Sequence, residues 1–93
     1  MRPLGHGDLS AAGCALLSVV PAARPALLTR MLVEAEAADA YRRDTGRLHP
    51  LWGNGSLMSV AMVRPRRREP FLDDPDYAAC LAMIFDAVLE RAG

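Results

Sequence analysis

Apolar side chains recur along this chain at steps of three and four residues, and no stretch alternates as a half-buried strand does. This spacing predicts an all-α fold. We expect one helical domain over residues 1–93, with helices at about 8–20, 22–44, 56–64 and 75–91. A short connection should make the first two helices an antiparallel hairpin. A short third helix and a C-terminal amphipathic helix complete the predicted fold.

The C-terminal helix has the clearest pattern. Asp74 is placed to cap it, Pro75 suits the first helical position, and Asp76 complements the positive helix end. Seven apolar residues then fall on one stripe: Tyr77, Cys80, Leu81, Ile84, Phe85, Val88 and Leu89. So wide a stripe needs a hairpin or a partner groove to lie in. Asp73, Asp74 and Asp76 together could also hold a divalent cation, but their order favours capping.

The other helices carry start and stop signals of their own. Asp8 is the expected N-cap of the first helix and either Ser56 or Asn54 that of the third, and Gly46 is expected to stop the second helix in a left-handed conformation. In the third helix, the side chains expected to face inward are Leu57, Met58, Ala61 and Met62. On the second helix, the spacing predicts two ion pairs, Arg30 with Glu34 and Asp39 with Arg43.

The charge balance argues against a nucleic-acid or membrane protein of the ordinary kind. Eleven basic and eleven acidic residues cancel, so the chain has no overall attraction to phosphate or to anionic lipid. The densest positive charge comprises Arg64, Arg66, Arg67 and Arg68. This run is either a solvated loop or a weak contact for phosphate groups. The short, apolar third helix offers no set of side chains for reading DNA bases.

No arrangement of residues indicates catalysis. His6, His49, Cys14 and Cys80 lack the spacing of a zinc site. Ser56 has no nucleophile elbow around it, and the glycine-rich turn before it lacks the P-loop pattern. We therefore expect no enzyme activity, no cofactor and no bound metal.

Trp52 is the lone tryptophan and lies beside Leu51 in a glycine-rich irregular stretch. Its large apolar ring either plugs the end of the small helical core or anchors a protein interface. We expect interface residues here and on the last helix. These are Trp52, Leu51, Tyr77, Leu81, Ile84, Phe85 and Val88.

The sequence shows no signal peptide, and the apolar run over residues 11–20 is too short to cross a bilayer. The two cysteines, Cys14 and Cys80, suit buried free thiols of a reducing compartment. A cytoplasmic protein that makes no membrane contact is therefore expected.

Three segments carry a family resemblance. They are residues 6–8, 48–58 and 70–77, with the sequences HGD, LHPLWGNGSLM and PFLDDPDY. They resemble a family of short, uncharacterised alphaproteobacterial proteins. Proteins of this size and helical make-up open the structural gene clusters of phage-like gene transfer agents, where they serve as small terminases.

The resemblance implies a non-catalytic DNA-packaging adaptor. Such a protein forms homo-oligomers, docks on the large terminase motor and binds DNA weakly and without sequence specificity. Phage small terminases usually carry a helix-turn-helix DNA reader, and this sequence departs from them in lacking one. The alternative is a small regulatory protein that binds one client through the Trp52 loop or the C-terminal helix.

Overall fold

The computed structural model describes residues 1–92, and within them the chain is helical without a β-strand. The elements in chain order are α1 (His6–Leu17), the 3-10 turn η1 (Pro21–Ala23), α2 (Arg24–Thr45), α3 (Leu57–Met62) and α4 (Pro75–Ala92). The all-α prediction is confirmed.

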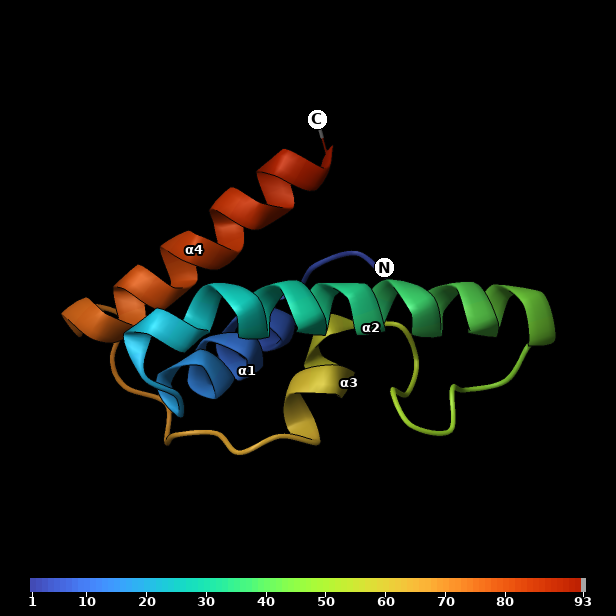
Figure 1. The fold of residues 1–93 in the computed structure, drawn as a ribbon, viewed down its shortest axis with the longest axis horizontal. Coiled ribbons are helices and arrows are strands. Elements are labelled where there is room, and N and C mark those ends of the chain that lie inside the picture. The colour runs from blue at the N-terminus through green and yellow to red at the C-terminus, as the bar shows by residue number, and fades with distance from the viewer. Residues whose placement is uncertain (93) are drawn as a thin grey trace.

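Helix α1 lies at the centre of the packing. It packs most extensively against α3 on one side and α4 on the other, and α2 contacts all three of these helices. As a result every residue from Ala11 to Leu16 is buried, and α1 has no polar face along this stretch. Small side chains at four of these six positions allow the neighbouring helices to approach closely. Figure 1 shows α2 as the long horizontal helix, with α4 rising away from it toward the C-terminus.

The helix ends mostly follow their capping signals. Ser56 Oγ accepts a hydrogen bond from the Ser59 amide at 3.1 Å, and Asp74 Oδ1 accepts one from the Tyr77 amide at 2.9 Å. Gly46 ends α2 at a φ of 72°, in the left-handed conformation that glycine adopts without strain. These three predicted caps are confirmed.

Helix α1 begins and ends earlier than predicted. It starts at His6 with Gly5 as N-cap, which makes Asp8 its third residue. From inside the helix, Asp8 accepts hydrogen bonds from the amides of Gly5, at 2.8 Å, and of Met58, at 2.9 Å. The carboxylate therefore stabilises the start of α1 and also fixes α3 beside it. The predicted N-cap role of Asp8 is wrong because the backbone is already helical there.

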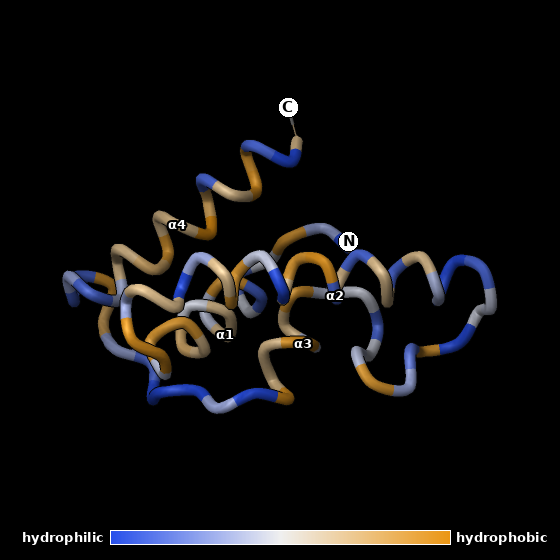
Figure 2. The backbone as a smooth tube through the Cα atoms, in the orientation of Figure 1, coloured by the Kyte–Doolittle hydropathy of each residue, from blue (hydrophilic) through white to orange (hydrophobic). Residues whose placement is uncertain are grey.

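The inward face of α3 also differs from the prediction. Leu57, Val60 and Ala61 are buried, whereas Met58 and Met62 are exposed. Only one side of this short helix meets the core, and the methionines lie on the other side. In Figure 2, which colours the chain by residue hydropathy, the mainly hydrophobic residues of α3 are followed directly by a strongly hydrophilic connection.

Candidate protein-binding surface

A buried arginine fixes the start of α4. The Nε of Arg24 donates to the Leu16 carbonyl oxygen at 3.0 Å, and its two terminal nitrogens donate to the Asp76 carboxylate at 2.6 and 3.0 Å. The hydrogen bond from Arg24 holds the pKa of Asp76 below its ordinary value. One guanidinium thus joins the end of α1, the start of α2 and the first turn of α4. Sequence spacing gave no signal for this contact, because its partners are 52 residues apart.

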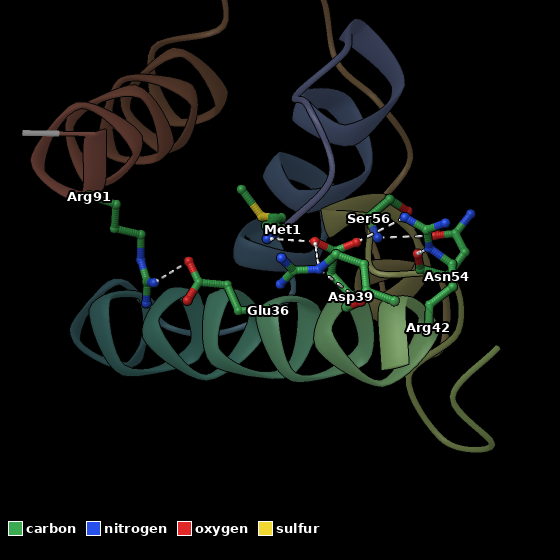
Figure 3. A network of polar contacts seen from close by, with 8 residues as sticks. Met1, Glu36, Asp39, Arg42, Asn54, Ser56 and Arg91 are labelled. Atoms are coloured by element: carbon green, nitrogen blue, oxygen red, sulfur yellow. Dashed lines mark hydrogen bonds and ion pairs between the residues drawn. The ribbon is translucent and has the colours of Figure 1, made fainter. Parts of the chain in front are cut away.

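A second ion pair holds the far end of α4. Arg91 Nη1 lies 2.7 Å from Glu36 Oε1 on α2, as Figure 3 shows. With contacts at both ends, α4 presents a fixed outer surface. The placement of that surface therefore does not depend on a mobile terminus.

An apolar groove of about 730 Å³ runs between α4 and the first turns of α1. It is lined by His6, Gly7, Leu9, Ser10, Glu69, Leu72, Tyr77, Ala78, Leu81, Ala82 and Phe85. We call it the α1–α4 groove. Its main polar feature is Glu69, whose carboxylate accepts a hydrogen bond from the Tyr77 hydroxyl at 3.2 Å. Burial, reinforced by Glu69, raises the pKa of Tyr77 to about 12, so this hydroxyl is a hydrogen-bond donor at neutral pH.

Exposed large apolar side chains line this groove at Leu72 and Phe85, and others lie near these in the chain at Phe71 and Leu89. Phe71 is 88% exposed, Leu72 72%, Phe85 49% and Leu89 69%. A single exposed apolar residue is ordinary in a folded protein, but several beside an apolar groove form a patch of the kind that binds another protein.

The predicted interface stripe of α4 is divided between core and surface. Tyr77 and Ile84 are fully buried, and Leu81 and Val88 pack with them in the core. Tyr77 and Ile84 are therefore not free interface side chains in this fold, whereas Leu81 contributes an edge to the groove and Val88 is half-buried. Phe85 is exposed. The prediction does not hold for Tyr77 and Ile84, because an amphipathic stripe does not show whether its partner lies in the same chain.

The arginine run divides in a similar way. Arg64 Nη2 lies 2.8 Å from Glu34 Oε2, so Arg64 is engaged in a half-buried ion pair. Glu34 therefore does not form the predicted pair with Arg30. Arg66, Arg67 and Arg68 are exposed, and the Arg67 amide donates to the Cys14 carbonyl oxygen at 3.0 Å. That bond fixes the connection across α1.

The three exposed arginines border a hollow of about 280 Å³ beside α3. Its lining is Ser10, Ala11, Cys14, Met58, Met62, Arg66, Arg67, Arg68 and Glu69. We call it the α3 hollow. It combines exposed methionine side chains with positive charge, in contrast to the α1–α4 groove.

The Trp52 loop is held by its own contacts. The amides of Leu51 and Trp52 both donate to His49 Nδ1 at 3.1 Å, which closes a tight turn. The Trp52 ring stacks on the His49 ring at a centroid distance of 4.6 Å, and Tyr41 meets His49 edge-on. Trp52 is half-buried and packs against the core, which fits the plug interpretation better than the anchor. Leu51 at the tip is exposed.

Asp39 ties this loop region to α2. Its carboxylate pairs with the Met1 amino group at 3.3 Å and with Arg42 at 3.1 Å, and Figure 3 draws both partners beside it. It also lies 3.5 Å from Arg43 Nε. The Asp39–Arg43 pair was predicted. The hydrogen bond from Arg42 is the main reason that the pKa of Asp39 is lowered. The Cβ of any other residue at Gly55 would lie 2.6 Å from the Asp39 Cα, so the loop needs glycine there. The contacts of Asp39 therefore hold α2, the N-terminus and the backbone at Gly55 close together.

The remaining candidate residues lie apart. Cys14 and Cys80 are buried free thiols whose pKa values are raised by burial. Across residues 1–92, no three histidine, cysteine, aspartate or glutamate side chains come together as a metal site. None of the helices in this part of the chain has both the length and the apolar character needed to cross a membrane.

The comparisons with known proteins give one match. No curated protein and no solved structure is similar to the chain. The sequence pattern of one family matches residues 2–88, which is nearly the whole chain. That extent agrees with the expected resemblance to an uncharacterised family, and it adds no support for a small-terminase identity. The chain belongs to the family described as domain of unknown function DUF7742.

Proposed function

We propose that this protein is a non-catalytic assembly or adaptor protein that binds another protein chain through the α1–α4 groove. The observation that carries the proposal is that Leu72 and Phe85 line this apolar groove and are exposed, with exposed Leu89 one helical turn beyond Phe85. The start of α4 is held by the buried Arg24 through Asp76, and an exposed ion pair from Arg91 to Glu36 adds a weaker contact at its far end. Because the groove is formed before binding, its own side chains lose less conformational entropy when a partner binds.

A finer form of the proposal follows from the family resemblance. In that form the protein is a small-terminase-like subunit of a phage-like gene transfer agent, and its partner is the large terminase motor. Contact with DNA would then come from Arg66, Arg67 and Arg68, because Arg64 is engaged with Glu34. Three exposed arginines support weak binding without sequence specificity.

The alternative is a regulatory protein that binds one client. The contacts of Trp52 with His49 and the core favour α4 over the Trp52 loop as the surface for that client. Both versions therefore share the α1–α4 groove and differ in what occupies it.

Site-specific photo-crosslinking tests the shared proposal. The photoreactive residue p-benzoylphenylalanine replaces Phe85 in one variant and Val33 in a control, because Val33 is an exposed apolar residue of α2 away from the groove. In cells that naturally make the protein, the Phe85 variant should give a defined protein adduct that the Val33 variant does not give. An adduct with a large terminase would support the packaging role. Equal labelling at the two positions would overturn the proposal.

A further inference from the structure

Two consecutive segments in the second half of the chain carry opposite charge. Residues 57–68 contain four arginines and no acidic residue. Residues 71–92 contain five acidic residues and one arginine, Arg91, which is paired with Glu36. The α3 hollow is thus bordered by positive charge, and the helix beside the α1–α4 groove is negatively charged.

The two hollows are neighbours on the molecular surface. Ser10 and Glu69 belong to the lining of both, so the α1–α4 groove and the α3 hollow meet across α1. Helix α1 packs between α3 and α4, and the connection that carries Arg66–Arg68 crosses it, so Arg67 and Arg68 also line a hollow with Asp74 and Asp76 at the start of α4. The basic end of this surface is that connection together with α3, and the acidic end lies further along α4. We call this combined surface the bipolar face.

Charged side chains at each end of the bipolar face have no intramolecular ion pair among residues 1–92. At the basic end these are Arg66, Arg67 and Arg68, and at the acidic end they are Asp86 and Glu90. At 100° per residue, Asp86 lies about 40° around α4 from Ala82 and about 60° from Leu89, and Glu90 lies one turn beyond Asp86 and about 100° from Leu89. Charges left unpaired beside exposed apolar side chains are available to a partner.

Apolar surface is present at both ends as well. Met58 and Met62 are exposed at the basic end, and Phe85 and Leu89 are exposed at the acidic end. Flexible methionine side chains adapt their shape to a neighbouring surface. An occupant of the bipolar face therefore needs apolar groups flanked by acidic charge at one end and by basic charge at the other.

We propose that this occupant is a second copy of the same chain, related by a two-fold axis. A half-turn places the basic end of one copy over the acidic α4 of the other, and the same contact occurs twice. Apolar contacts then supply affinity, and the opposite charges fix the register. This inference rests on the proposed function, because it names the protein that the α1–α4 groove binds.

Charge reversal tests the arrangement directly. One variant carries Arg66→Glu and Arg67→Glu, and a second carries Asp86→Arg and Glu90→Arg. Size-exclusion chromatography with light scattering should give the wild type a mass of twice 10.1 kDa. Each variant alone should dissociate with a Kd raised at least about tenfold, since like charges then face each other. An equimolar mixture of the two variants should regain the wild-type dimer, because both contacts are again between opposite charges.

A matched control keeps the result specific. Arg30→Glu with Asp44→Arg reverses two exposed charges of α2 and should leave the dimer intact. Circular dichroism should show every variant folded, as all substituted side chains are exposed.

Four outcomes would overturn the inference. They are a wild type that stays monomeric at its highest soluble concentration, a mass that grows beyond the dimer, a mixture that does not associate, and an arginine variant that loses only DNA binding. A monomeric wild type whose Phe85 position crosslinks to a different protein would leave the proposed function standing.

Discussion

The two long helices differ in what they leave exposed. Helix α2 buries Leu28, Met31 and Leu32, and six of its eleven exposed residues are charged residues or threonines, with Val33 as an isolated large aliphatic residue among them. Helix α4 buries Tyr77 and Ile84 but exposes Phe85 and Leu89 on its outer side. Core packing accounts for both inner faces. The outer face of α4 places two large apolar side chains four residues apart, which is why the proposed binding surface lies on α4 and not on α2.

The largest expected effect comes from separating α4 from the core. A Cβ at Gly13 would lie 2.8 Å from Tyr77 Cε1 and 2.9 Å from Leu81 Cδ2. Gly13→Leu should therefore force α1 and α4 apart and lower the free energy of unfolding by about 3 kcal/mol. Urea denaturation measures this loss. Gly7→Ala is the control, because its Cβ meets only the flexible Met58 side chain, and it should change stability little. Equal losses for the two variants would contradict the close packing of α1 and α4.

The next effect comes from the contact that joins α2 to α4. Arg24→Met removes three hydrogen bonds, to the Leu16 carbonyl and to Asp76, but keeps an apolar side chain of similar length. Its thermal midpoint should fall by less than that of Gly13→Leu and by more than that of Arg30→Met, which changes an exposed arginine of the same helix. Scanning calorimetry ranks the three, and an Arg24→Met midpoint equal to that of Arg30→Met would argue against the contact.

Acid should lower the stability of the fold by protonating two carboxylates, one on α2 and one on α4. The pKa values of Asp39 on α2 and Asp76 on α4 are lowered in the folded state by hydrogen bonds from arginine. Their stabilisation is therefore complete above the unfolded pKa of about 3.9 and is lost as the pH falls through the lower folded values. Melting between pH 7 and pH 2 should show a falling midpoint. Asp39→Asn and Asp76→Asn should each flatten that fall, and an unchanged profile in both would contradict the assignment.

Base should act on the contact between α1 and α4, through Tyr77 and through the buried thiols Cys14 and Cys80, whose pKa values are also raised. The pKa of Tyr77 is raised to about 12, so the folded state keeps its phenolic proton when the unfolded chain begins to lose it near pH 10. Stability should then decrease as the pH rises from 10 toward 12. Tyr77→Phe should reduce this loss, as followed by circular dichroism at alkaline pH. A steeper alkaline loss in Tyr77→Phe would count against the buried hydrogen bond.

The smallest effect on stability should accompany the clearest effect on binding. Phe85→Gln with Leu89→Gln changes exposed side chains, so the free energy of unfolding should stay within about 0.5 kcal/mol of the wild type. The double variant should nevertheless lose self-association in sedimentation experiments, whereas Val33→Gln on α2 should not. If only Val33→Gln lost self-association, the association surface would lie on α2 and not on α4.

Local signals predicted much of this fold. The caps at Ser56 and Asp74 and the glycine stop at Gly46 depend on residues within a few positions, and the chain pattern shows them directly. The contact of Arg24 with Asp76 joins distant segments, so no local pattern contains it. The same reason explains the α4 stripe, because periodicity identifies an apolar face without saying how much of it the chain itself covers. The groove and the hollow depend on the assembled helices and were not predictable.

The turn at His49 gives the protein a built-in optical reporter. Since His49 Nδ1 accepts two backbone amides, its ring must carry the proton on Nε2 while the turn is closed. The lone indole lies flat against that imidazole, at an interplanar angle of 7°. Its fluorescence should therefore respond to opening of this turn, which shares no lining residue with the α1–α4 groove. Emission and assembly can be recorded in the same cuvette as independent signals.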